Sequence, residues 1–167
     1  MNYLLFGGTH NVGKSETIWR ITQNLRNRRF TIVAGSIPTL PIPLPPIPFP
    51  DFKVVLQGTD RTGKTINVLI NSPTDDPTKI KELRDFLDSL NFSVDILISS
   101  IRDANSWPRQ CFEIAFPINP PVDFRLEIPL AKIIRQRADF QAALTWYQQT
   151  IDLLVKHILS RDPFNIF

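Results

Sequence analysis

One short segment near the N-terminus constrains the fold of this chain more than any other. The apolar run Asn2–Phe6 is followed by the glycine-containing stretch GGTHNVGKS and then by SETIWRITQNLRNR. In the last stretch Ile18, Ile21 and Leu25 recur at helical spacing, and no proline interrupts them, which predicts a helix. The order is therefore a buried strand, a tight glycine turn and a helix, and this order favours an α/β fold.

Two segments match the pattern G-x-x-x-x-G-K-[ST]: residues 8–15 (GTHNVGKS) and residues 58–65 (GTDRTGKT). Only the first lies between a strand pattern and a helix pattern. The second is preceded by DFKVVLQ and followed by TINVLINSP, whose β-branched residues alternate and whose Pro73 prevents a long helix. We predict that residues 58–65 form the polar turn of a β-hairpin.

Each residue type in the first segment suits the binding of phosphate groups. Two glycines let backbone N–H groups converge at the positive end of the helix dipole. Lys14 can then reach the terminal phosphates, and the Ser15 hydroxyl can hold Mg²⁺. The residues predicted to contact a nucleotide are Gly8, Thr9, His10, Asn11, Val12, Gly13, Lys14, Ser15 and Glu16.

On the residues GTHNVGKS, placed between a strand and a helix, the chain resembles the P-loop nucleoside triphosphatase superfamily. The resemblance does not select one family within it. It implies a three-layer α/β fold whose sheet is mostly parallel with an antiparallel hairpin strand, and a nucleotide at the carboxyl ends of the strands. It also implies a nucleoside triphosphate and Mg²⁺ as ligands. Because the guanine-reading motif Asn-Lys-x-Asp does not occur, ATP is the expected nucleotide.

The rest of the chain alternates strand and helix patterns within what we expect to be a single domain, residues 1–167. A helix is predicted over 76–90, with Asp76 as its N-cap and Pro77 in its first turn. A long helix is predicted from near Ala131 to Ser160. Further strands are predicted at 29–35, 51–57, 65–70, 93–101 and 123–130.

A proline-rich arm at residues 37–51 interrupts this alternation. Its core, Pro38–Pro50, has seven prolines in thirteen residues, with apolar side chains between them. Because proline cannot donate to a sheet ladder, the arm is predicted to be extended or polyproline II. A rigid apolar arm loses little entropy on binding, so it is either a surface for a protein partner or self-association, or a stiff connector packed on its own domain.

Acidic residues are expected near the metal. The P-loop resemblance implies a carboxylate at a strand end that contacts Mg²⁺ through water, but this chain has Asn71 at that point, followed by Asp75 and Asp76. Asp75 is therefore the predicted metal residue beside Ser15. The alternative for both aspartates is capping of the helix that follows.

Charged residues after the strand at 93–101 are the catalytic candidates, together with Lys14. The guanidinium of Arg102 can neutralise charge on a transferring phosphoryl group, and Asp103 can take the proton of an acceptor hydroxyl. Solvated surface charges are the alternative reading for the arginines. Further arginine candidates of the same kind are Arg109, Arg135 and Arg137.

Composition excludes other classes of protein. With one cysteine, Cys111, and no Cys/His cluster at metal-ligand spacing, a reducing cytoplasmic setting is expected. No apolar run reaches the length of about 18 residues that spans a membrane. The formal net charge of +3 is too small to favour nucleic acid as a partner.

These patterns together predict a Mg²⁺-dependent ATPase whose hydrolysis is slow or stimulated by a partner. Two alternatives stay open. One is a small-molecule or nucleotide kinase, which needs an acceptor pocket and a carboxylate. The other is a nucleotide-dependent switch or adaptor without catalysis. In that case Asn71, in place of an acidic residue, would explain the loss of metal chemistry.

Overall fold

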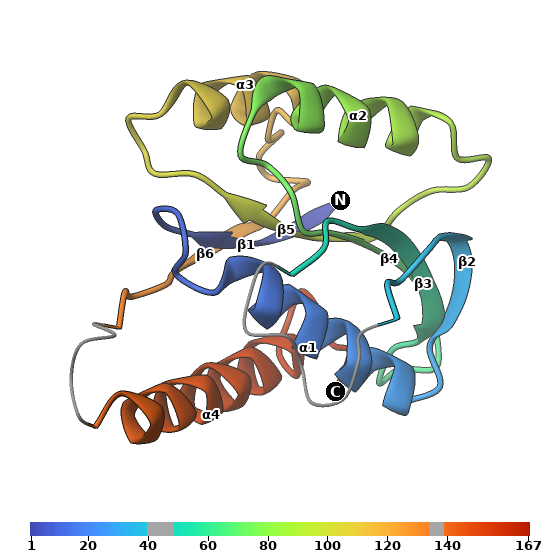
Figure 1. Cartoon of the computed structure of the whole chain (residues 1–167). Helices are drawn as coiled ribbons and strands as arrows, with labels where there is room; N and C mark the ends of the chain where they lie inside the picture. The colour runs from blue at the N-terminus through green and yellow to red at the C-terminus, as the bar shows by residue number, and fades with distance from the viewer. Residues whose placement is uncertain (40–48, 134–138) are drawn as a thin grey trace.

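The computed structural model describes residues 1–39, 49–133 and 139–167. These residues form a six-stranded mixed sheet covered by helices on both faces (Figure 1), which is the predicted α/β class. The strands are β1 (Asn2–Gly7), β2 (Thr31–Gly35), β3 (Lys53–Thr59), β4 (Thr65–Asn71), β5 (Ile96–Ile101) and β6 (Arg125–Pro129). The helices are α1 (Lys14–Asn27), α2 (Pro77–Asp88), α3 (Trp107–Ala115) and α4 (Phe140–Leu159).

The sheet has the strand order β2-β3-β4-β5-β1-β6. β1 lies between β5 and β6 and is parallel to both, and β4 is parallel to β5. β3 is antiparallel to β4 and β2 is antiparallel to β3, as expected for a mostly parallel sheet with a hairpin strand. The carboxyl ends of β4, β5, β1 and β6 therefore share one edge, and the loops that follow them meet there.

Two hydrophobic cores separate the three layers. On one face, Leu4 and Phe6 of β1 pack in one cluster with Ile18 of α1 and Val155 of α4. On the other face, a second cluster forms between the sheet and the helices α2 and α3. Successive side chains of a strand point to opposite faces, so the near-continuous apolar strands of this sequence serve both cores.

The second glycine-lysine segment is the turn between β3 and β4, as predicted. The carboxylate of Asp60 accepts hydrogen bonds from the backbone N–H groups of Thr62 (2.8 Å) and Lys64 (3.0 Å). Gly63 has a φ of 85°, a left-handed conformation that glycine adopts without steric cost. Because β4 follows directly, no helix N-terminus faces this turn.

The start of α2 was predicted correctly from the sequence, whereas the start of α4 was not. Asp76 caps α2 as expected, because its side chain accepts a hydrogen bond from the Lys79 N–H at 3.1 Å. The predicted start of the last helix near Ala131 is wrong: residues 131–133 are not helical, and α4 begins at Phe140. The Ala131 N–H instead donates to the Tyr147 hydroxyl at 2.8 Å. This contact joins residues sixteen positions apart, so the local sequence pattern does not predict it.

Helix α3 was not predicted. It begins after Ser106 and carries a proline in its first turn, which are start signals that a sequence analysis can use. Phe112 is its one buried residue, so the helical apolar repeat that normally identifies a helix is weak here.

Both described ends of the proline-rich arm contact the domain itself. Ile37 packs against the core on the α1 side, and the Phe49 ring centroid lies 6.0 Å from that of Trp19. Residues 40–48 of the arm, and the candidates Arg135 and Arg137, lie outside the described residues. Within the described part of the chain, no helix combines the length and apolar character needed to cross a bilayer.

Candidate functional site

The glycine loop, residues 8–13, connects β1 to α1. Its backbone has positive φ at Gly8 (143°), Asn11 (60°) and Gly13 (88°). A Cβ atom added at Gly8 would lie 2.9 Å from Val12 Cγ2 and 3.2 Å from the Leu130 carbonyl oxygen, so only glycine fits there without displacing its neighbours. Val12 is buried in the core and anchors the loop.

Lys14 is held against the loop. The residue is only 8% exposed, and its Nζ donates hydrogen bonds to the carbonyl oxygens of Gly8 (2.8 Å) and Thr9 (2.7 Å). Burial lowers the pKa of the Lys14 ammonium; Arg102 acts in the same direction, whereas Asp75 and Asp103 oppose it. The predicted residues Asp75, Arg102 and Asp103 therefore all lie within electrostatic range of Lys14.

The N-terminus of α1 has no side-chain cap. Gly13 occupies the N-cap position and has no side chain that could cap the first turn. The first N–H groups of a helix have no partner within the helix and form its positive end. Glu16, in this turn, accepts hydrogen bonds from Arg20 and from Gln148 of α4. Its carboxylate therefore connects the two helices.

A cavity of about 500 Å³ opens beside the loop and the first turn of α1. Residues 10–16 of the predicted nucleotide site, including Ser15, line one side of it. Phe140, Leu144 and Tyr147 line another side from the first half of α4, at the spacing of one helix face. The other apolar lining residues are Phe49, Ala131 and Ile133. The inner face of α4 therefore covers open space here, with a volume typical of small-molecule sites.

Three carboxylates line the cavity, those of Glu16, Asp51 and Asp75, and the sequence analysis did not identify Asp51. Asp75 pairs with Arg102, whose Nη1 lies 3.3 Å from Asp75 Oδ1. The buried Nε of Arg102 has no hydrogen-bond partner among the described residues. Asp51, at the end of the arm, also lines the cavity. Burial raises the pKa of Asp51, with Lys79 acting against this and nearby acidic residues with it. No spacing in the sequence marks Asp51, because its position depends on contacts between distant segments, such as the hydrogen bond from the Phe52 N–H to Ser72 Oγ (3.1 Å).

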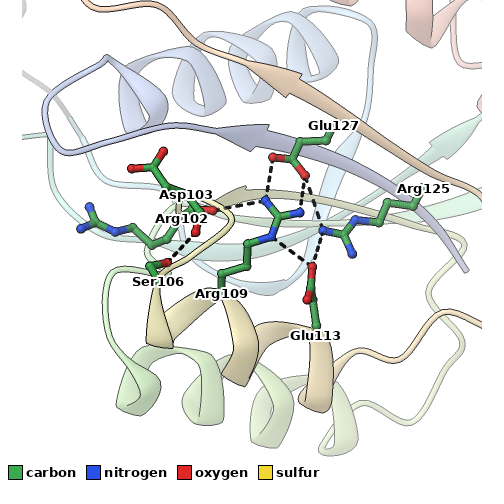
Figure 2. A network of polar contacts seen from close by, with 7 residues as sticks. All are labelled: Arg102, Asp103, Ser106, Arg109, Glu113, Arg125 and Glu127. Carbon is green, nitrogen blue, oxygen red and sulfur yellow. Dashed lines mark hydrogen bonds and ion pairs between the residues drawn. The ribbon is translucent and has the colours of Figure 1, made fainter.

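Asp103 lies at a different hollow from Lys14 and Asp75. It lines a second hollow of about 490 Å³ on the other side of the glycine loop, together with Gly8, Thr9 and Val12. The backbone carbonyl of Asp103 accepts hydrogen bonds from the N–H (3.0 Å) and hydroxyl (2.8 Å) of Ser106 (Figure 2). Arg102 is therefore connected to the cavity through its ion pair with Asp75, whereas Asp103 lines the second hollow.

A charged network holds the end of β5 next to the loop (Figure 2). Both Nη atoms of Arg109, from α3, donate to the Glu127 carboxylate at 2.8 Å, and its Nε donates to Glu113 at 3.0 Å. Hydrogen bonds to Glu127 are the main reason that the pKa of Arg109 is raised. Arg109 Nη1 also donates to the Arg102 carbonyl oxygen at 3.3 Å. A Cβ atom at Gly7 would lie 2.5 Å from Glu127 Oε1, so the network reaches the start of the glycine loop.

Asn71 does not lie in a metal-facing position. It is fully buried, and its Nδ2 donates to the Pro73 carbonyl (2.8 Å) and to Ser99 Oγ (3.1 Å). Leu69, two residues earlier on β4, belongs to the core on the α2–α3 side, so Asn71 points to that side too. Ser15 is on α1, which covers the opposite face. The sequence predicted correctly that the strand ends near Asn71. It did not predict to which face of the sheet the Asn71 side chain points.

Comparisons with protein-family models, with curated proteins and with solved structures gave no match to this chain. A functional assignment must therefore rest on the loop, the cavity and the charged groups around them. Among the described residues, no group of three or more His, Cys, Asp or Glu side chains could hold a metal ion by itself.

Proposed function

We propose that this chain is a P-loop nucleoside triphosphate-binding protein, and that it acts as a Mg²⁺-dependent ATPase with slow or partner-stimulated hydrolysis. The observation that carries this proposal is the position of Lys14. It is buried, bonded to two carbonyls of its own loop, and next to an uncapped helix N-terminus at the wall of a 500 Å³ cavity.

The loop and α1 would bind the phosphates. Uncapped N–H groups and the helix dipole favour an anion at this point, and Lys14 adds a full positive charge. The Lys14 ammonium can donate to phosphate oxygens in addition to a loop carbonyl, since it has three N–H donors. The apolar wall from α4 suits the ring of a nucleoside base, and ATP is the nucleotide expected by default.

Ser15 and Asp75 are the residues that would hold Mg²⁺. Both line the cavity. Mg²⁺ in such sites usually has one or two protein ligands and takes the rest of its octahedron from phosphates and water, so this small donor set fits. The metal would supply neutralisation of phosphate charge. The chain's own contribution is orientation, because Arg102 pairs with Asp75 at 3.3 Å and limits where its carboxylate can point.

Asp75→Asn is expected to raise the Mg²⁺ concentration needed for half-maximal nucleotide binding by roughly three- to tenfold, because it removes the charge that attracts the metal. Asp76→Asn is the matched control, since asparagine caps helices as well as aspartate does and the net charge changes equally. Magnesium titrations of nucleotide affinity check this. Equal magnesium requirements in both variants would contradict a metal role for Asp75.

A kinase is the second candidate function, and Asp51 is the observation that favours it. Asp51 lines the same cavity as the loop and has a raised pKa caused mainly by burial. A carboxylate beside the phosphates can accept the proton of an attacking hydroxyl. Asp103, the carboxylate expected from the sequence to do this, lines the other hollow. A transfer reaction would therefore place its acceptor next to Asp51.

The fate of the γ-phosphate distinguishes these functions. The full chain is incubated with γ-labelled ATP, Mg²⁺ and a mixture of hydroxyl-bearing metabolites, and the label is followed over time. We expect slow release of free phosphate that Lys14→Ala abolishes. Label recovered on a metabolite, and lost in Asp51→Asn, would identify a kinase instead. Bound but unchanged ATP would indicate a switch or adaptor, and no binding at all would overturn the proposal.

A further inference from the structure

A third hollow lies at the opposite edge of the sheet from the glycine loop. Its volume is about 450 Å³, and it is formed by the carboxyl-terminal ends of α1 and α4 and by the turn between β3 and β4. Helix α1 runs from the glycine loop to this end of the molecule (Figure 1). With 14 residues at about 1.5 Å each, it separates the two places by roughly 20 Å. The lining residues are Arg28, Arg61, Leu153, Lys156, His157, Ser160 and Phe167.

Basic side chains from three separate segments converge on this hollow. Arg61 Nη1 donates to the Ser160 carbonyl at 3.0 Å, and the Arg28 guanidinium carbon lies 4.2 Å from the centroid of the Phe167 ring. Within the described residues, none of Arg28, Arg61, Lys156 and His157 forms an ion pair. Most of their N–H donors therefore lack an acidic acceptor.

The partial negative charges at the C-termini of α1 and α4 offset only part of the positive charge of these side chains. Each helix C-terminus is equivalent to roughly −0.5 charge, so α1 and α4 together offset about one of the three permanent cations Arg28, Arg61 and Lys156. A bound anion would relieve the remaining repulsion.

We propose that this hollow binds a phosphate-rich anion of the size of a di- or triphosphate. Guanidinium groups match pairs of phosphate oxygens, and the Lys156 ammonium adds a point charge. Leu153 and Phe167 give the hollow an apolar part, against which an organic group attached to the phosphates can pack. The site uses no residue of the glycine loop, so it stands independently of the ATPase proposal.

Isothermal titration calorimetry with inorganic tripolyphosphate tests this site. The titrations use the full chain carrying Lys14→Ala, which removes the main cation of the glycine loop. In that background, Arg61→Ala with Lys156→Ala is expected to weaken binding at least tenfold, because two charged donors are lost. The matched control is Arg26→Ala with Lys81→Ala, which removes two exposed cations that do not line the hollow. We expect less than a threefold change for the control.

Three outcomes separate this site from the glycine loop. Equal weakening by both double variants would overturn the inference, because it would indicate unspecific attraction by net charge. Loss of all binding in Lys14→Ala alone would also overturn it, while supporting phosphate binding at the loop. Binding that Lys14→Ala leaves intact and that the hollow variant removes supports the inference.

The single variant Lys156→Ala tests the site even if the double variant does not fold. Its side chain forms no ion pair in the described structure, so only the small loss of its interaction with the dipole of α4 is expected. Melting curves of each variant check that the fold is retained. In the Lys14→Ala background, this single change is expected to weaken tripolyphosphate binding roughly threefold or more. Unchanged affinity in a folded Lys156→Ala protein would count against the site.

Discussion

Replacing Lys14 with alanine is expected to weaken nucleoside triphosphate binding by roughly 100-fold. Hydrogen bonds to charged groups contribute about 1.5–3 kcal/mol each, and a loss of about 2.7 kcal/mol corresponds to two powers of ten in affinity. The large effect follows from burial, because Lys14 is 8% exposed and a charge in such a place is poorly screened by solvent.

Lys64→Ala is the matched control, because Lys64 occupies the same position in the second glycine-lysine segment. Its side chain is 66% exposed and pairs with Asp95 at 3.2 Å, and exposed pairs contribute about 0–1 kcal/mol. We expect its nucleotide affinity to stay within about twofold of that of the unaltered chain. Calorimetry with ATP and Mg²⁺ measures both variants, and melting curves check that Lys14→Ala keeps its fold. Similar losses in both variants would contradict the choice of loop.

The parts of the fold that sequence analysis predicted correctly depend on local signals. The strand before Gly8 and the helix after Gly13 follow from apolar spacing over adjacent residues. The turn at Asp60 and Gly63 follows from turn chemistry, and the cap of α2 follows from the pair Asp76 and Pro77. In each case the residues that determine the structure are close together in the chain.

The parts that were missed depend on contacts between distant segments. The cavity wall of Phe140, Leu144 and Tyr147 has the same helical spacing as a core face, and only the packing of α4 over the loop distinguishes the two. Asp51 lines the cavity next to Phe52, whose backbone N–H bonds to Ser72, a residue twenty positions further along the chain. The side of the sheet that Asn71 faces depends on which helices cover which layer, which no single strand pattern contains.

The second large effect is expected from Arg109→Ala, which should lower the free energy of unfolding by about 2–3 kcal/mol. Removing one partner of a fully buried ion pair costs about 3–5 kcal/mol. A smaller cost is appropriate here, because Arg109 and Glu127 side chains are 14% and 29% exposed. For a chain of this length the melting temperature should fall by roughly 4–12 °C. Lys81→Ala, which breaks the exposed pair with Asp85, should change stability by less than about 0.5 kcal/mol.

The cost of Arg109→Ala arises from Glu113 and Glu127, which lose their closest cation and keep only Arg125 as a partner. Adding Glu127→Gln should therefore restore part of the lost stability, because the amide carries no charge that needs compensation. Arg109→Lys should restore less than half, since an ammonium cannot reproduce the two parallel hydrogen bonds to Glu127. Denaturant unfolding of the four proteins measures these differences. If the double variant is as unstable as Arg109→Ala, the loss comes from packing of α3 and not from unpaired charge. In either case ATP affinity should fall with Arg109→Ala, because Arg109 also holds the carbonyl of Arg102 beside the loop that carries Lys14.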